Sequence, residues 1–162
     1  MGCWLFQPCK SCRLKMANTQ VKVQQYQSYP TTHAFLTDWG HHILGLMGPF
    51  GSGKSSVCAL KLRMIAEQQA PNAEGIRSTR QAIVRNTYPE LKDTTLKTVL
   101  DWLPDDVFGT LNQSRMIYTM NYKLEDGTTV HSELLFRALD KPTDVKHLLS
   151  LELTSAWFNE VR

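Results

Sequence analysis

Residues 48–55 read Gly-Pro-Phe-Gly-Ser-Gly-Lys-Ser and match the pattern G-x-x-x-x-G-K-[ST] at every fixed position. A short apolar run at residues 43–47 (ILGLM) comes directly before the motif, and apolar residues at helical spacing follow it. Glycines let such a loop curl so that its backbone N–H groups point inward, and the next helix presents its positive N-terminal end to the same point. The motif therefore predicts a buried strand, a phosphate-binding loop and a helix in succession.

The residue types in this loop indicate a nucleoside triphosphate as the ligand. Lys54 supplies a mobile positive charge for the β and γ phosphates, and the Ser55 hydroxyl is a ligand for the Mg²⁺ that bridges them. A plain glycine turn before a helix has no need for this lysine and serine together. The predicted phosphate-binding residues are Gly48, Gly51, Ser52, Gly53, Lys54, Ser55 and Ser56.

Composition places the chain among globular proteins. It has 162 residues, 42% of them hydrophobic, and a formal net charge of +3. A disordered chain would be poorer in apolar residues, and no apolar stretch reaches the about 18 residues that a membrane-spanning helix needs. A charge surplus this small does not by itself indicate a nucleic-acid partner.

The remaining pattern alternates between strands and helices. Helices are predicted at residues 32–39, 57–65, 91–103 and 144–150, and strands at 43–47, 81–84 and 151–158. Residues 115–137 instead alternate around Asp126-Gly127, which is the signature of a hairpin. This order predicts an α/β fold with a mainly parallel sheet flanked by helices and an inserted antiparallel hairpin.

The first fifteen residues differ from the rest. They contain Cys3, Cys9 and Cys12 but no acidic residue. Cys9 and Cys12 form a CxxC pair, yet no second pair supplies the further ligands of a structural zinc site. We expect residues 1–15 to be a disordered or non-native tail, with Met16 as a candidate start, and residues 16–162 to form the folded part.

Two positions outside the loop have the features of a nucleotide site. Arg85 follows the second apolar run, near the sheet edge where nucleotides bind in such folds. Asn159 and Glu160 follow the last apolar run, where Asn159 is placed to act on hydrated Mg²⁺ and Glu160 to orient an attacking water. Each interpretation has a plainer alternative. Arg85 could be an ordinary surface arginine, and Asn159 and Glu160 could be a strand end that turns to solvent. The pair Asp105-Asp106 is a rival, but it follows Pro104 and is typical of a loop or helix cap.

Several segments in order resemble the N-terminal ATPase region of the large terminase subunit of tailed bacteriophages, the motor that packages DNA into capsids. They are YQSYPTTHAF, LGLMGPFGSGKSS, IVRNTYPELKDTTLKTVLDWLP and LLSLELTSAWFNEVR, which together span roughly residues 26–162. The resemblance implies a P-loop NTPase fold of the additional-strand, catalytic-glutamate type that binds ATP and Mg²⁺. Glu160 then stands at the catalytic glutamate position, Asn159 at the preceding acidic position and Arg85 at the arginine after the second strand.

The resemblance also implies partners and departures. Double-stranded DNA, the portal protein and the small terminase subunit are the implied partners, with a homo-oligomeric ring in the full-length protein, no membrane, and the cytoplasm of the infected bacterial host as the location. Many terminases carry an arginine in this loop that acts as an arginine finger, and here Pro49 and Phe50 stand in that stretch. The resemblance therefore implies an arginine finger from elsewhere in the protein or from a neighbouring subunit. Family members continue into a coupling motif and a nuclease domain, so we expect the ATPase domain here to be incomplete and the nuclease domain absent.

Two other functions fit part of the sequence. A P-loop nucleotide kinase shares the phosphate loop, but it would follow the loop with an arginine-rich lid, where this chain has a hairpin. A non-catalytic nucleotide-binding module is favoured by the neutral Asn159. ATPase assays with and without double-stranded DNA separate the three.

Overall fold

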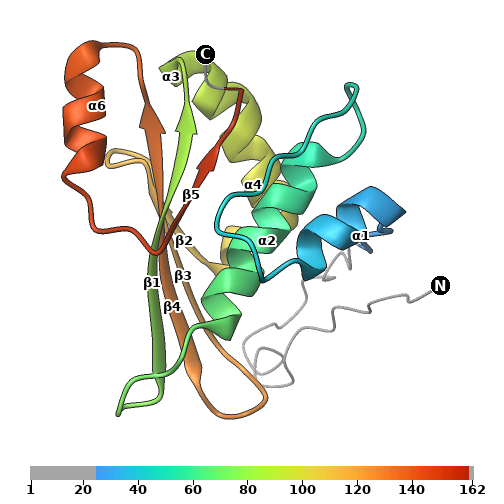
Figure 1. Cartoon of the computed structure of the whole chain (residues 1–162). Helices are drawn as coiled ribbons and strands as arrows, with labels where there is room; N and C mark the ends of the chain where they lie inside the picture. Colours follow the sequence, from blue (N-terminus) through green and yellow to red (C-terminus); the bar gives the residue numbers. More distant parts are fainter. Residues whose placement is uncertain (1–24, 161–162) are drawn as a thin grey trace.

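A five-stranded mixed sheet forms the centre of the fold in the computed structural model, which describes residues 25–160 (Figure 1). The strand order is β2-β3-β4-β1-β5. The strands are β1 (Ile76–Arg85), β2 (Gly109–Asn112), β3 (Ile117–Lys123), β4 (Thr129–Ala138) and β5 (Ser155–Phe158). The helices are α1 (Pro30–Thr37), α2 (Lys54–Gln68), α3 (Tyr88–Glu90), the π-helical η2 (Leu91–Leu96), α4 (Lys97–Trp102), α5 (Asp105–Phe108) and α6 (Pro142–Leu149).

The α/β class and the flanking helices are confirmed, but the sheet is mixed rather than mainly parallel. Strand β1 pairs in parallel with β4 and with β5, whereas β3 is antiparallel to both β2 and β4. The hairpin predicted around Asp126 and Gly127 is present as β3 and β4. Its second strand pairs with β1 along its whole length, from Ile76↔Thr129 to Arg85↔Ala138. The hairpin therefore supplies a central strand and is not an appendage to a finished sheet.

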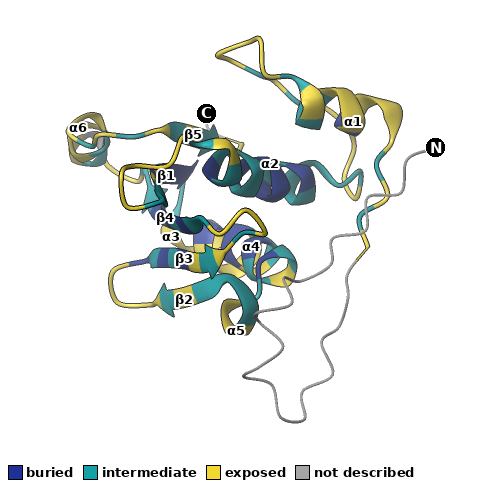
Figure 2. Cartoon of the chain, turned by 90° about the horizontal axis from the view of Figure 1, so that it is seen from below, coloured by how far each residue is buried: buried dark blue, intermediate teal, exposed yellow. Residues whose placement is uncertain are grey.

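The hydrophobic core lies between the sheet and one layer of helices. Ala59 and Leu62 of α2, Val99 of α4 and Ile83 of β1 belong to the same buried cluster as Leu134 of β4. Figures 1 and 2 place α2 and α4 against this face and α6 on the other side of the sheet, where most of its residues are exposed. The helical spacing of apolar residues after the phosphate loop thus predicted α2 and its buried face.

Residues 43–47 do not form the predicted buried strand. No strand is assigned there, and the side chains of Ile43 and Met47 are 91% and 94% exposed. A strand is stable only when a neighbour completes its hydrogen-bond ladder, and no described strand pairs with this segment. The apolar run has the composition of a strand, but composition does not supply a partner.

Helix α1 is fastened to α2 through a buried lysine. The Nζ of Lys61 donates to the carbonyl oxygens of Leu36 at 2.9 Å and Asp38 at 2.7 Å, and it lies 3.4 Å from the centre of the Trp39 ring. Burial lowers the pKa of Lys61, although the charge of Asp38 opposes this. The ammonium satisfies carbonyls at the end of α1 that have no partner within the helix. The beginning of the stretch between α1 and α2 is therefore held against α2.

The predicted helix at residues 91–103 is present as three consecutive pieces, α3, η2 and α4, which cover residues 88–102. The Thr87 side chain accepts a hydrogen bond from the backbone N–H of Glu90 at 3.4 Å, which caps the first turn. The middle piece is π-helical, a geometry that widens the turn and often occurs at functional sites. Periodicity predicted the helix but not this local widening.

Two further expectations concern the N-terminal residues and membrane-spanning helices. The predicted tail at residues 1–15 and the candidate start at Met16 lie outside the described residues. Among residues 25–160, no helix combines the length and the apolar character that crossing a membrane requires.

The turn between β3 and β4 depends on a carboxylate. Asp126 Oδ1 accepts hydrogen bonds from the hydroxyl of Thr128 at 2.6 Å and from its backbone N–H at 2.9 Å, and Arg77 Nη2 donates to Oδ2 at 2.7 Å. The pKa of Asp126 is lowered to about 2, mainly by the two hydrogen bonds from Thr128 and to a lesser extent by Arg77.

We predict that this turn loses stability in acid. The Asp126 pKa is lower in the folded than in the unfolded protein, so its contribution is complete above the ordinary value of 3.8 and is lost as the pH falls towards 2. Urea unfolding of the wild type and Asp126→Asn should show a smaller acid loss in the variant across this interval. An identical pH profile for the two proteins would contradict the assignment.

Candidate functional site

The predicted phosphate loop leads directly into the first turn of α2. Gly51 and Gly53 have positive φ angles of 74° and 77°, a region that side chains with a Cβ rarely adopt. Gly53 is the N-cap of α2, and no side chain caps this helix end. The first-turn N–H groups of α2 are consequently available to an anion, as at any uncapped helix N-terminus. Gly51 and Gly53 therefore have a backbone conformation that favours glycine, whereas the φ of Gly48 is not in this region.

Lys54 is folded back over the loop. Its Nζ donates to the carbonyl oxygens of Gly48 and Pro49, both at 2.7 Å, and the Ser52 hydroxyl donates to the same Pro49 oxygen at 2.8 Å. An ammonium has three N–H donors, so one remains beyond these two bonds. These contacts hold a positive charge against the carbonyls at the start of the motif, beside the first turn of α2. Phe50 is 98% exposed at the loop tip.

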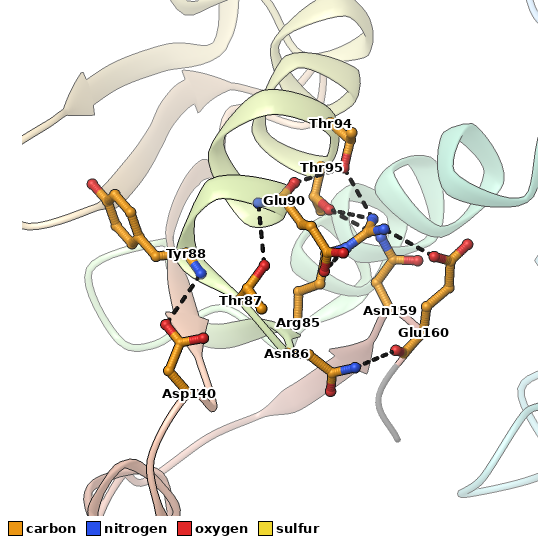
Figure 3. Close-up of polar contacts among 10 residues, drawn as sticks. All are labelled: Arg85, Asn86, Thr87, Tyr88, Glu90, Thr94, Thr95, Asp140, Asn159 and Glu160. Carbon is orange, nitrogen blue, oxygen red and sulfur yellow. Dashed lines mark hydrogen bonds and ion pairs between the residues drawn. The ribbon is translucent and has the colours of Figure 1, made fainter.

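Arg85 is the centre of a second cluster, at the carboxyl end of β1 (Figure 3). Its guanidinium donates to Glu90 at 3.3 Å, to Thr94 at 3.0 Å, to Thr95 at 3.4 Å and to Glu160 at 2.8 Å. Its side chain is only 13% exposed. The interpretation of Arg85 as a plain surface arginine is thus wrong, because most of its side chain is buried and its guanidinium donates hydrogen bonds to several side chains.

Asn159 and Glu160 join this cluster from the end of β5. The backbone N–H of Asn159 donates to the Val84 carbonyl at 2.8 Å, which extends the β1–β5 ladder by one residue. Asn159 is 9% exposed, and its amide nitrogen donates to Thr95 Oγ1 at 2.9 Å. Arg85 and Asn159, which lie far apart in the sequence, therefore meet at one sheet edge.

Glu160 adopts an unusual backbone conformation. Its φ is +52°, which costs a residue with a Cβ about 1–2 kcal/mol. Two contacts offset this cost: the Arg85 ion pair, and a hydrogen bond of 3.1 Å from the Asn86 side chain to the Glu160 carbonyl. The Glu160 side chain is still 57% exposed. A carboxylate held at a strained backbone position and open to solvent is suited to bind a water.

The phosphate loop and the Arg85 cluster lie at the same end of the sheet. The strands β1, β4 and β5 point towards the end of the fold at which α2 begins (Figure 1). Among the described residues, no group of three or more His, Cys, Asp or Glu side chains could hold a metal ion. Of the residues predicted from the sequence, Ser55 has a hydroxyl, Asn159 an amide oxygen and Glu160 a carboxylate that could face such an ion. This set fits a hydrated Mg²⁺ shared with phosphates, since Mg²⁺ keeps several of its waters.

The sequence did not identify the residues that surround Arg85. Thr94, Thr95, Glu90 and Asn86 all contact Arg85 or the residues that follow β5. The one available signal was the pair of adjacent threonines, which is unusual in a helix because β-branched residues are poor helix formers. Their role depends on a strand that follows much later in the chain, so local pattern alone does not reveal it.

Two other polar groupings lie away from this end. Asp105 and Asp106 occupy the first turn of α5, beside the β2 edge of the sheet and not at β5 (Figure 2). A cavity of about 480 Å³ on the helix-poor face is lined by Arg80 and Glu133, which are already paired at 2.7 Å. Neither grouping contains a residue of the phosphate loop.

Comparison with known proteins identified no relative: no protein-family model matches this chain, and neither does any curated protein or solved structure.

We predict that Arg85 stabilises the fold more than a typical surface arginine. Arg85→Met keeps the buried stem but removes every hydrogen bond of the guanidinium, so we expect the free energy of unfolding to fall by about 1–3 kcal/mol. Arg80→Met is the matched control, because Arg80 lies on the same strand with a half-exposed side chain and a single ion pair. Its cost should be below about 1 kcal/mol. Equal urea-unfolding midpoints for the two variants would refute this difference.

Proposed function

We propose that this chain is an ATP-binding and ATP-hydrolysing P-loop module, and that it works as the motor ATPase of a phage large terminase subunit. The observation that carries the first part is a combination of two features. The complete phosphate-loop motif leads into α2. At the same end of the sheet, Asn159 and Glu160 directly follow β5, the strand that pairs with β1. The terminase assignment rests on the sequence resemblance alone.

Each residue has a definite role in this proposal. The loop residues Gly48 to Ser56 surround the phosphates with backbone N–H groups, and Lys54 leaves the Gly48 and Pro49 carbonyls to contact them. Bound Mg²⁺ would neutralise phosphate charge, with the Ser55 hydroxyl as its protein ligand and the Asn159 amide oxygen facing its waters. Glu160 accepts a proton from the attacking water, and Arg85 fixes the position of that carboxylate.

One feature of the proposed fold is not present in the five-stranded sheet. A P-loop unit consists of a strand, the loop and a helix, whereas residues 43–47 lie outside the sheet. The exposed Ile43 and Met47 side chains are those that such a strand would bury. The additional-strand, catalytic-glutamate assignment is therefore part of the proposal, and it rests on the sequence resemblance alone.

The two alternatives make different demands on the same site. A nucleotide kinase would transfer phosphate to a second nucleotide, and a non-catalytic module would bind ATP without turnover. Glu160 favours hydrolysis over both, because its half-exposed carboxylate can hold a water where a kinase requires a protected acceptor. Steady-state ATPase assays discriminate the three, and stimulation by double-stranded DNA is expected only of the terminase motor.

We predict that Lys54→Ala weakens ATP binding by about 10- to 100-fold, the loss expected for one charged hydrogen-bond donor. The measurement is calorimetric titration of Mg·ATP into the full chain. Lys92→Ala is the matched control, since Lys92 is an exposed lysine of η2 and its loss removes the same charge. Equal affinities for the wild type and Lys54→Ala would refute a phosphate-binding role for the loop.

We also predict that Glu160→Gln retains ATP binding but lowers turnover by about 10²-fold or more, because the amide cannot accept the proton of the attacking water. Glu90→Gln is the control, because Glu90 is the other carboxylate paired with Arg85. It should keep near-normal turnover. Wild-type turnover in Glu160→Gln would move the base elsewhere, with Asp105 and Asp106 as the next carboxylates to test.

A further inference from the structure

Thr95 connects the Arg85 cluster to the end of β5. Its side chain lies in the π-helical segment η2, and the residue is 1% exposed. Its Oγ1 accepts hydrogen bonds from Asn159 Nδ2 at 2.9 Å and from Arg85 Nη1 at 3.4 Å. A hydroxyl oxygen has two acceptor positions, and these two donors use both. The amide nitrogen of Asn159 is therefore held against a hydroxyl oxygen that also accepts from Arg85.

The two ends of the Asn159 side chain are chemically different. The nitrogen only donates hydrogen bonds, and the oxygen only accepts them. With Nδ2 committed to Thr95, the oxygen is directed to the opposite side, towards Glu160 (Figure 3). Turning the amide over would place its oxygen against Thr95 and its N–H donors towards Glu160. In that orientation the side chain presents no acceptor to a cation or to its bound waters.

This directional requirement follows from the asparagine itself. A carboxylate at position 159 would offer two equivalent oxygens, so either orientation would present an acceptor. An amide works only when its oxygen faces the cation, and a neighbour must hold it in that orientation. The adjacent Thr94 is engaged elsewhere, since its hydroxyl donates to the Glu90 carbonyl at 2.6 Å and accepts from Arg85 at 3.0 Å. Thr95 is thus the residue placed to orient the amide.

We propose that Thr95 is a positioning residue that accepts the Asn159 amide N–H and so directs the Asn159 oxygen towards the hydrated Mg²⁺ of a bound nucleotide. This proposal rests on the function proposed above. It also gives the π-helical segment a role, because η2 brings a buried hydroxyl to the end of a strand that lies 64 residues further along the chain. Thr95 itself contacts neither nucleotide nor metal.

The first test measures how much Mg²⁺ supports nucleotide binding. Titration of Mg²⁺ into the full chain with a fluorescent ATP analogue gives the half-saturating Mg²⁺ concentration. Thr95→Val has nearly the same shape without the acceptor, so it should raise that concentration about 3- to 10-fold, the effect of one hydrogen bond. Thr95→Ser restores the hydroxyl and should return it to within about 2-fold. Thr94→Val is the control and should match the wild type.

A second substitution separates orientation from general damage to the fold. In an Asn159→Asp background either oxygen can face the cation, so adding Thr95→Val should change the half-saturating Mg²⁺ concentration by less than about 2-fold. The same shift in both backgrounds would mean that Thr95 acts by supporting the structure, and it would overturn the proposal. No shift in the Asn159 background would overturn it as well.

A third measurement needs no nucleotide. In NMR spectra of the nucleotide-free protein, the side-chain amide protons of Asn159 should be protected from exchange in the wild type and in Thr95→Ser. They should lose that protection in Thr95→Val. Unprotected amide protons in the wild type would overturn the inference. If Thr95→Val does not fold, Thr95→Ala, which also lacks the hydroxyl, is measured in its place, and retained protection in that variant would overturn the inference.

The two proposals fail in different ways. If the wild type binds nucleotide no better than Lys54→Ala, the proposed function is wrong and the role of Thr95 towards Mg²⁺ is wrong with it. If the wild type binds through Lys54 but Thr95→Val shows an unchanged Mg²⁺ requirement, only the role of Thr95 is overturned.

Discussion

The parallel pairing of β1 with both β4 and β5 is the constraint on which the rest of the structure depends. Parallel strands end at the same edge of a sheet, so the residues that follow them are brought together wherever they lie in the sequence. The register Val84↔Phe158 places Asn159 and Glu160 beside the end of β1, where Arg85 stands. Helix α2 packs on the same central strands and begins at this edge, so the phosphate loop arrives there too. One pairing pattern thus assembles three segments that are remote from one another in the chain: the end of β1, the residues after β5 and the loop before α2.

Arg85 converts this proximity into a defined arrangement. A guanidinium presents five donors in a fixed plane, and here they reach carboxylates from two elements and the hydroxyls of two successive threonines. Thr94 and Thr95, which are adjacent in the π-helical η2, both accept hydrogen bonds from this group. The strained Glu160 backbone is held in place by the same arginine and by Asn86. In the proposed function, the Arg85–Glu160 ion pair within this network holds the carboxylate that acts on the attacking water.

Prediction from sequence was accurate where the signal was local. The hairpin around Asp126 and Gly127, the helix after the candidate phosphate loop and the amphipathic helix predicted at residues 91–103 are all present, because turn chemistry and apolar spacing are properties of a few neighbouring residues. The prediction of a buried strand at residues 43–47 was wrong, because an apolar run does not reveal whether a ladder partner exists. The expected mainly parallel sheet was mixed, because the pattern of the hairpin did not show that its second strand would pair with β1.

The same division applies to the candidate site. The sequence by itself predicted the candidate phosphate loop, since residues 48–55 contain the glycines, the lysine and the serine, and the positive φ angles of Gly51 and Gly53 follow from local backbone freedom. Only the tertiary structure decided that Arg85 is the centre of a hydrogen-bonded cluster and that it pairs with Glu160, which lies 75 residues further along the chain. The same holds for the contact between Thr95 and Asn159. The physical reason is that these contacts exist only after strand register and helix packing have fixed which side chains meet. No local preference in either partner specifies the other.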